Sequence, residues 1–234
     1  MVTLSYPQSL RPAVNDSALL TESAILASLA IERSRAEQQR LAAQALIQDQ
    51  ALHDALTHLP NRRLLVNNLN LALAAHRRNG HVGALMFLDL DNFKPLNDRH
   101  GHAVGDLLLI EVAQRLRQHV REMDTVARFG GDEFVVLLSD LGADAAMARE
   151  QAHSAAQKLS QTLAEPYLLT PAAGAAASEN VTHRCTASIG LLVFNGGTAT
   201  ADALLEQADA AMYQAKQAGR NRVHCVEDNA ATAA

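Results

Sequence analysis

The chain has 234 residues, of which 48% are hydrophobic and 19% charged, and its formal net charge is −5 at pH 7. This length can bury one full hydrophobic core and leave material for an appended segment. The negative balance and the absence of Trp provide no basic surface for DNA or RNA, so we expect no nucleic-acid partner.

The cysteines and the apolar runs indicate a cytoplasmic protein. Cys185 and Cys225 lie outside any Cys-x-x-Cys or zinc-ligand pattern, so we interpret both as reduced thiols. No apolar run approaches the length that spans a bilayer, and the N-terminus lacks the basic start and apolar core of a secretory signal. We therefore expect no membrane segment in this chain.

A long helix is predicted near the N-terminus. From Ala18 to about Ala55 the sequence has no Gly or Pro and is dominated by strong helix formers. A thin apolar stripe runs along it at helical spacing, through Leu41, Ala45, Gln48 and Leu52. The stripe fits a parallel coiled coil between two copies of the chain, and it equally fits an amphipathic helix folded back on its own domain.

Helix and strand patterns alternate irregularly after this segment. Helices are expected at about 62–79, 105–120, 143–164 and 201–218, and strands at 83–89, 125–138, 182–194 and 222–226. A hairpin within the sheet predicts an α/β (α+β) fold with a mixed central sheet flanked by helices. We expect a helical linker at 1–53, one domain at 54–228 with a mobile loop at 170–180, and a disordered tail at 229–234.

The hairpin carries the most informative residues. Two strand-like runs are joined by Gly130 and Gly131, and Gly adopts positive φ without steric cost. Asp132 and Glu133 follow directly, and two adjacent carboxylates repel each other unless a cation or water neutralises them. This turn therefore suits a metal-bound phosphate lying against the backbone, although an ordinary exposed hairpin with acids facing water has the same local pattern.

A second acidic site favours the metal interpretation. The apolar run from Ala84 to Leu88 has the pattern of a buried central strand and leads into Asp89 and Asp91. Period-two geometry places these acids on one side of the strand end, where a hard cation with oxygen ligands can compensate their burial. A calcium loop is disfavoured, because Phe93 takes its third ligand position and Lys94 replaces its required Gly.

These residues resemble GGDEF domains, the diguanylate cyclases that condense two GTP molecules into cyclic di-GMP. Gly-Gly-Asp-Glu-Phe at 130–134 is similar to the family signature, and four more blocks agree in order and spacing, at 54–62, 88–94, 97–106 and 215–221. The resemblance implies the palm-like nucleotidyl cyclase fold shared with adenylyl cyclases. It also implies a homodimer, because each family active site is half of what the reaction needs.

The N-terminal helix has a weaker resemblance. Residues 26–37 resemble the closing helix of GAF sensor domains, which often precede a cyclase. This implies that the predicted helix carries a signal from a sensor domain that is missing from the chain.

The GGDEF resemblance assigns roles at the acidic sites. It implies that Asp89, the backbone carbonyl of Leu90 and Asp132 hold Mg²⁺ or Mn²⁺, with two ions in each active site. Glu133 is the candidate to assist deprotonation of the attacking ribose 3′-hydroxyl, or else a further metal ligand. The glycines at 130–131 let the α-phosphate approach the backbone, which a Cβ would prevent.

Substrate contacts are implied in the same way. Asn97 and Asp106 supply the amide and carboxylate that complement the edge of guanine. Cations suited to the β- and γ-phosphates are Lys94, Lys216, Arg220 and Arg128. Pro95 departs from the usual family pattern beside Lys94.

A regulatory site is implied before the hairpin. Arg121 and Asp124 resemble the family's Arg-x-x-Asp site, at which the product inhibits the enzyme, and a helix-end ion pair is the simpler alternative. The sequence therefore predicts a metal-dependent, dimeric diguanylate cyclase that converts GTP to cyclic di-GMP and pyrophosphate under product inhibition. A catalytically silent module that binds GTP or cyclic di-GMP is the alternative function.

Overall fold

The computed structural model describes most of the chain. It describes the backbone of residues 14–171 and 180–227, and the side chains of these ranges except 14–20 and 41–50. Most of the expected mobile loop, the expected tail and three side chains of the predicted apolar stripe lie outside the described residues. The choice between a coiled coil and a folded-back helix therefore stays a prediction.

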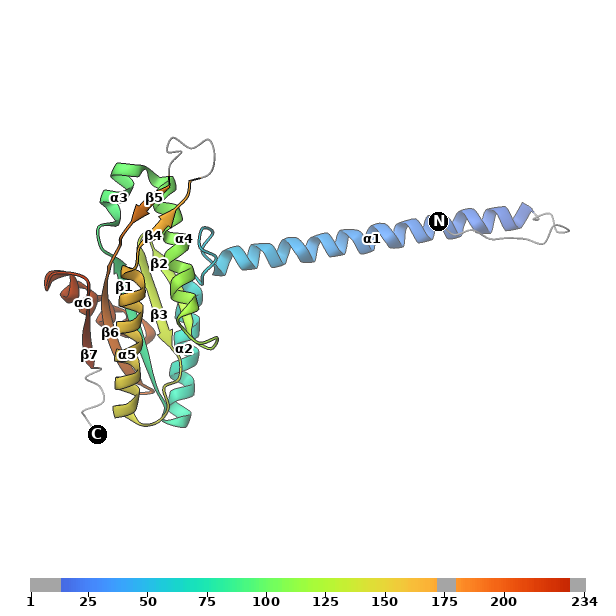
Figure 1. The fold of residues 1–234 in the computed structure, drawn as a ribbon. Coiled ribbons are helices and arrows are strands. Elements are labelled where there is room, and N and C mark those ends of the chain that lie inside the picture. The colour runs from blue at the N-terminus through green and yellow to red at the C-terminus, as the bar shows by residue number, and fades with distance from the viewer. Residues whose placement is uncertain (1–13, 172–179, 228–234) are drawn as a thin grey trace. The chain divides into compact units, whose positions relative to one another are not determined.

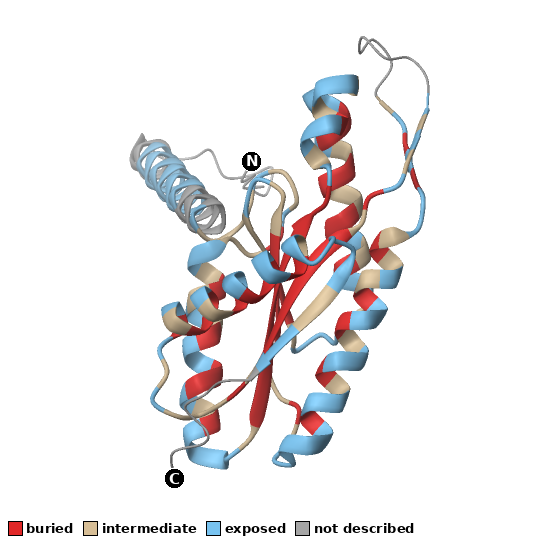
Figure 2. Ribbon diagram, turned by 90° about the vertical axis from the view of Figure 1, so that its left-hand side faces the viewer, coloured by how far each residue is buried: buried red, intermediate tan, exposed pale blue. Residues whose placement is uncertain are grey.

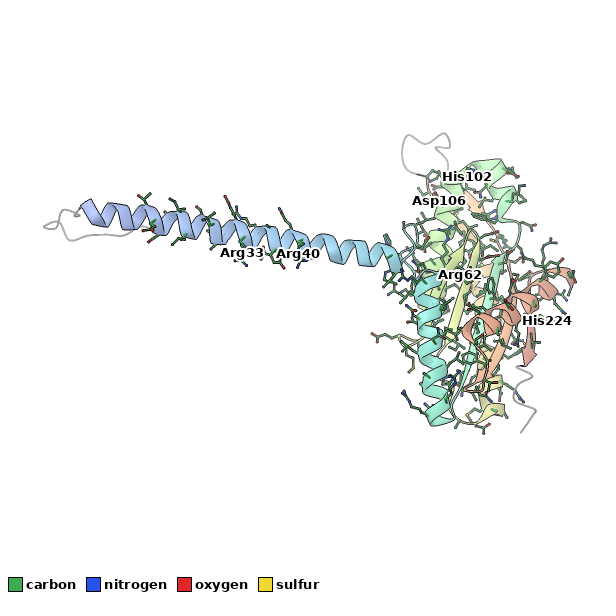
Figure 3. The ribbon with its side chains drawn as sticks, turned by 180° about the vertical axis from the view of Figure 1, so that it is seen from behind. Arg33, Arg40, Arg62, His102, Asp106 and His224 are labelled. Carbon is green, nitrogen blue, oxygen red and sulfur yellow. The ribbon has the colours of Figure 1, made fainter. Side chains whose placement is uncertain are left out.

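The chain divides into two units between Ala51 and Leu52. Helix α1 (Val14–Leu52) confirms the long helix that the composition predicts. Four of its apolar side chains, those of Ile25, Leu26, Leu29 and Ile31, are more than half exposed. Arg40 donates to Glu37 one turn earlier, and Figure 3 labels Arg33 and Arg40 along this helix. None of the described helices is long and apolar enough to cross a membrane.

The second unit is built on a five-stranded sheet. Its strand order is β2 (Thr125–Gly130), β3 (Glu133–Leu138), β1 (Val82–Leu90), β6 (Ala187–Asn195) and β7 (Arg222–Glu227). All neighbours are antiparallel except β6 and β7, which are parallel. The predicted mixed central sheet is confirmed (Figure 1). A separate antiparallel pair joins β4 (Tyr167–Leu169) and β5 (Val181–His183).

Among the described residues of this unit, five helices accompany the strands. They are α2 (Arg62–Asn79), α3 (Phe93–His100), α4 (His102–Gln118), α5 (Ala145–Ala164) and α6 (Ala201–Gln217). Buried side chains of α4 and α5 pack in one apolar cluster, and those of α2 and α6 pack in another. The sheet lies between these clusters, so the domain has three layers.

The central strand β1 contributes side chains to both apolar clusters. All nine of its residues are buried, and Figure 2 shows buried strands in red at the centre of the domain. Met86 and Leu88 belong to the cluster with α4 and α5, whereas Leu85 and Phe87 belong to the cluster with α2 and α6. Alternation on a strand thus explains why the sequence shows a continuous apolar run here.

Capping residues place both ends of helix α2 where the sequence predicts them. Helix α2 has the predicted bounds, because Asn61 accepts hydrogen bonds from the backbone N–H groups of Arg63 and Leu64 at its start. Gly80 ends the same helix with φ +71°, a conformation that Gly adopts easily.

The structure corrects other boundaries. Helix α3 was not predicted, because Pro95 argues against a helix, yet Pro95 lies in its first turn, where the N–H groups have no intrahelical partner anyway. Helix α4 begins at His102 rather than Gly105 and ends at Gln118. Val120, the last residue of the predicted helix, therefore lies beyond the observed one, although it still packs against the core.

Gly190 provides a test of how α6 packs on the sheet. A Cβ added there would collide with the backbone of Ala208 and Met212. We expect Gly190→Ala to lower the free energy of unfolding by about 2 to 4 kcal/mol, because backbone atoms of a packed helix cannot move aside cheaply. Urea unfolding of the full chain measures this change.

Gly130→Ala is the matched control, since the space around a Cβ at Gly130 is open. Its unfolding free energy should stay within about 0.5 kcal/mol of the wild type. Equal stability of the two variants would contradict the packing described for Gly190.

Candidate functional site

The hairpin turn lies beside the end of β1. In the ladder between β1 and β3, Asp89 is the partner of Glu133. The backbone N–H of Leu90 donates to the carbonyl oxygen of Asp132 at 3.2 Å. The two acidic segments that the sequence separates by about forty residues therefore meet at one end of the sheet.

The two turn glycines have different reasons to be Gly. Gly131 has φ +52°, in the left-handed region that favours Gly. Gly130 does not have a positive φ, and a Cβ added to it would meet no atom within 4 Å. Neither backbone conformation nor internal packing thus explains Gly130, and the open space over it can admit a ligand.

Arg128 holds this turn in place. Its Nε and Nη2 donate to the carbonyl oxygen of Gly131 at 3.0 and 2.8 Å, and its Nη1 donates to both carboxylate oxygens of Asp54 at 3.0 and 3.2 Å. The phosphate contact expected for Arg128 stays a prediction, and the structure gives the guanidinium these protein partners.

Asp54 is the other end of this clamp. Its Oδ1 accepts hydrogen bonds from the backbone N–H and the hydroxyl of Thr57, at 2.8 and 2.7 Å. Burial alone would raise the pKa of Asp54, but the hydrogen bonds from Thr57 and Arg128 outweigh it, and the pKa lies below its ordinary value. The link between Asp54 and Arg128 was not predicted, because nothing local in the sequence pairs residues 74 positions apart.

Burial and neighbouring acids raise the pKa of Asp89 and Glu133. Asp89 is 8% exposed, and burial raises its pKa, with the charges of Asp132 and Asp91 adding to this effect. Burial also raises the pKa of Glu133, with further contributions from Asp89, Asp209 and Asp132. Such a cluster gains stability when a cation neutralises it.

Lys216 provides one such cation. Its Nζ lies 2.6 Å from Oδ2 of Asp89, and both pKa shifts described above are reduced by its charge. Lys216 is on the last turn of α6, and Arg220 follows in the exposed turn after it. The structure therefore brings Lys216 to the carboxylates, and its expected contact with phosphate stays a prediction.

The sequence predicts that a cation compensates the burial of Asp91, whereas the structure surrounds its carboxylate with protein donors. Asp91 is 3% exposed and accepts hydrogen bonds from Ser188, Thr186 and the backbone of Asn221. Its burial is thus compensated by three protein donors, so no cation is needed for Asp91 itself.

The donor set suits a hard cation. Asp89, Asp132 and the carbonyl of Leu90 supply oxygen ligands, and Mg²⁺ typically combines one or two carboxylates with water and substrate phosphates. Among the described residues, no three His, Cys, Asp or Glu side chains converge on one point that could hold a metal ion. A metal here would therefore depend on oxygens from the substrate as well as from the protein.

The expected guanine-binding residues lie at the junction of α3 and α4. A Cβ on Gly105 would overlap the side-chain oxygen of Asn97, so this glycine lets the two helices approach closely. That oxygen is buried and has no hydrogen-bond partner among the described residues. Asp106 follows Gly105 and is exposed, as is Lys94 on α3 (Figure 3 labels Asp106). An unpaired buried acceptor beside an exposed carboxylate suits a polar ligand.

Arg121 and Asp124 lie in a different place. The carboxylate of Asp124 accepts hydrogen bonds from the backbone N–H groups of Arg121 and Ser139, at 3.0 and 3.2 Å. Among the described residues no ion pair joins the Arg121 side chain to Asp124, so the simpler alternative of a helix-end ion pair is not observed. Both residues line a cavity of about 900 Å³ beside α2, whose lining does not include Asp89, Asp132 or Glu133.

Comparison with known families agrees with this geometry. The family described as "Diguanylate cyclase, GGDEF domain" matches residues 51–222. The chain is 46% identical over 182 residues to the bifunctional diguanylate cyclase/cyclic di-GMP phosphodiesterase MucR of Pseudomonas aeruginosa, covering 77% of this chain and 24% of that protein. It is 37% identical over 193 residues to the diguanylate cyclase TpbB of the same species, covering 80% and 41%. The chain thus spans less than half the length of either relative.

A solved structure is similar over much of the chain. The crystal structure of the coiled coil and GGDEF domain of DgcB from Caulobacter crescentus, in complex with c-di-GMP, has a TM-score of 0.71 at 27% sequence identity. The similarity covers 86% of this chain and 99% of that one.

The clamp between Asp54 and Arg128 predicts a pH-dependent stability. We expect Asp54→Asn to lower the free energy of unfolding by about 1 kcal/mol at pH 7, because it removes a charge-assisted hydrogen bond from a partly buried pair. The folded pKa of Asp54 is lowered, so its contribution is present above the unfolded pKa and is lost as pH falls through the folded pKa. Urea unfolding of wild type and variant between pH 7 and about pH 3 tests this.

The difference in unfolding free energy between the wild type and Asp54→Asn should shrink as the pH approaches about 3. Glu206→Gln, which changes an exposed acid on α6, is the control and should alter stability by less than about 0.5 kcal/mol. A difference for Asp54→Asn that stays constant down to the lowest pH would contradict the assignment.

Proposed function

The chain belongs to the GGDEF family of diguanylate cyclases, and from this premise we propose that it condenses two GTP molecules into cyclic di-GMP with release of two pyrophosphates. The observation that carries the proposal is that the segments bearing Asp89, Asp132 and Glu133 meet at one end of the sheet, beside the open backbone at Gly130. Phosphoryl transfer needs charge neutralisation and alignment more than covalent chemistry, and this site offers both.

The acids have two different roles in the reaction, metal binding and proton removal. Mg²⁺ or Mn²⁺ held by Asp89, the carbonyl of Leu90 and Asp132 would neutralise the triphosphate. Glu133 takes the proton of the ribose 3′-hydroxyl, and burial raises the pKa of Glu133, which makes its carboxylate a stronger base. The freed 3′-oxygen bonds to the α-phosphorus of the other GTP, and the bond from that phosphorus to the oxygen bridging to the β-phosphate breaks.

The remaining residues bind and orient the substrate. Asn97 and Asp106 select guanine through the polar edge of the base, using the unpaired acceptor at the junction of α3 and α4. Lys94, Lys216 and Arg220 hold the departing pyrophosphate by charge-assisted contacts. The absent Cβ at Gly130 lets the α-phosphate lie close to the turn.

Two chains are needed to complete one product. Each site presents one GTP, so two sites must face each other, and we propose a homodimer. Helix α1, with its exposed apolar side chains, is the segment that would pair. The similar DgcB structure comprises a coiled coil and a GGDEF domain, which supports this arrangement. The GAF-like resemblance of residues 26–37, and the sensory input it implies, stay predictions.

Turnover of GTP tests the proposal directly. The full chain is incubated with GTP and Mg²⁺ over a range of protein concentrations, and the products are separated by chromatography. We expect cyclic di-GMP at a specific rate that rises with concentration, because encounter of two chains limits the reaction. Removal of the divalent metal by a chelator should stop it.

Asp132→Ala should abolish turnover in the same assay while the fold persists, because it removes an expected metal ligand. Asp144→Ala removes a carboxylate that caps α5 instead, and it should keep the activity. Absence of product at every wild-type concentration, with GTP or cyclic di-GMP still bound, would favour the silent binding module.

The cavity containing Arg121 and Asp124 is proposed as the site of product inhibition. The guanidinium of Arg121 is exposed and suits a phosphate or a guanine edge. We expect Arg121→Ala to raise the inhibition constant of cyclic di-GMP by about tenfold or more, since charge-assisted hydrogen bonds contribute roughly 1.5 to 3 kcal/mol. Initial rates measured with added cyclic di-GMP report this constant.

Arg63→Ala changes an exposed Arg at the start of α2, outside the cavity lining, and serves as the control. Its inhibition constant should match the wild type. Unchanged inhibition of Arg121→Ala would remove this cavity from the regulatory role.

A further inference from the structure

Asp91 is enclosed by hydrogen-bond donors rather than directed to solvent. Its Oδ1 accepts from the Ser188 hydroxyl at 2.7 Å, and its Oδ2 accepts from the Thr186 hydroxyl at 2.7 Å and the backbone N–H of Asn221 at 3.0 Å. Its own N–H donates to the carbonyl of Thr186 at 2.8 Å. A buried carboxylate with both oxygens engaged in this way fixes the segments that supply the donors.

The segment that Asp91 fixes is the turn between α6 and β7. Gly219, Arg220 and Asn221 have φ angles of +111°, +62° and +47°, so three successive residues lie at positive φ. For Arg220 and Asn221 this conformation is costly and needs support from its surroundings. On the α6 side the turn is supported by bonds from Gly219 N–H to the Lys216 carbonyl and from Arg220 N–H to the Ala215 carbonyl. On the β7 side the turn is supported by a hydrogen bond that the carboxylate of Asp91 accepts from the backbone N–H of Asn221.

This turn separates the two cations expected to bind the pyrophosphate end of GTP. Lys216 precedes it and contacts Asp89 at 2.6 Å, and Arg220 lies within it. Asp91 follows Asp89 by two residues along the chain. The position of Arg220 relative to the metal-binding carboxylate is therefore set through Asp91, the turn and the end of α6.

We propose that Asp91 is a positioning residue, which holds the turn of Gly219–Asn221 in place so that Arg220 and Lys216 meet the β- and γ-phosphates of the nucleotide bound at Asp89. The proposal rests on the proposed function for the identity of the nucleotide. It assigns Asp91 no contact with the metal or the substrate. Loss of its link to Asn221 should weaken binding of a triphosphate far more than binding of GMP, which lacks the two outer phosphates.

Two substitutions at Asp91 separate its roles. Asp91→Ala removes the acceptor for Asn221. Asp91→Asn keeps one carbonyl oxygen for Asn221 and Thr186, and its NH₂ group can donate to the Ser188 hydroxyl, which also accepts. If Asp91→Ala fails to fold, Asp91→Ser replaces it, because its hydroxyl is too short to reach Asn221.

The measurement is calorimetric binding of a non-hydrolysable GTP analogue and of GMP to the full chain with Mg²⁺. We expect Asp91→Ala to bind the analogue about tenfold or more weakly and GMP within about threefold of the wild type, in line with the loss of charge-assisted phosphate contacts. Asp91→Asn should stay within about threefold for both ligands. Asp144→Ala, which loses the carboxylate cap of α5, is the control for a purely structural change and should keep the ratio of the two affinities.

Hydrogen exchange of the Asn221 amide gives a readout that needs no nucleotide. It should be slow in the wild type and in Asp91→Asn, and fast in Asp91→Ala or Asp91→Ser. Equal losses of affinity for the analogue and for GMP, or an Asn221 amide that exchanges at the wild-type rate in the variants without an acceptor, would overturn the proposal.

The proposed function fails in a different way. A wild-type chain that binds the GTP analogue but makes no cyclic di-GMP from GTP would overturn turnover and leave the role of Asp91 intact. A wild-type chain that binds no guanine nucleotide would overturn the binding of phosphate at this turn as well, with the exchange of Asn221 still reporting its link to Asp91.

Discussion

Repulsion among Asp89, Asp132 and Glu133 is the constraint to which the surrounding structure responds. The antiparallel pairing of β1 with β3 brings these acids to one end of the sheet, and burial raises the pKa of Asp89 and Glu133. Lys216 lies against Asp89 and relieves part of the repulsion. Under the proposed function, a ligand that arrives with a divalent cation would relieve more of this repulsion and would bind more tightly for that reason.

The crowded turn also needs a rigid support, and the structure supplies it from two directions. Arg128 fixes the carbonyl of Gly131 to Asp54, near the beginning of the domain. Asp91 fixes the turn after α6 to the end of β1. Both anchors are hydrogen bonds between segments distant in sequence, and neither occupies the open face over Gly130. Preorganisation of this kind lets charges act on a substrate without reorganising as it binds.

The sequence predicted what local chemistry determines. Helix α2 has the predicted bounds because Asn61 and Gly80 are strong end signals, and the apolar run in β1 marked the central strand. Helix α3 was missed because Pro95 is unfavourable in most helical positions but not in the first turn. The bonds of Arg128 to Asp54 and of Asp91 to Asn221 could not be predicted, since they span 74 and 130 positions and depend on the completed sheet. Acidic pairs identified the site, and only the fold showed which acid is enclosed by donors.

Two features of the site have no explanation within the domain itself. Gly130 has neither a positive φ nor a neighbour that excludes a Cβ, so the turn would tolerate a larger residue. The side-chain oxygen of Asn97 is buried with no partner among the described residues, which normally costs free energy. Under the proposed function both features become favourable with a ligand, because a phosphate can use the bare backbone and the amide of Asn97 can pair with the polar edge of guanine. They lie on different elements, at β2 and α3, so a ligand satisfying both would carry a phosphate at one end and a hydrogen-bonding base at the other, as a guanine nucleotide does.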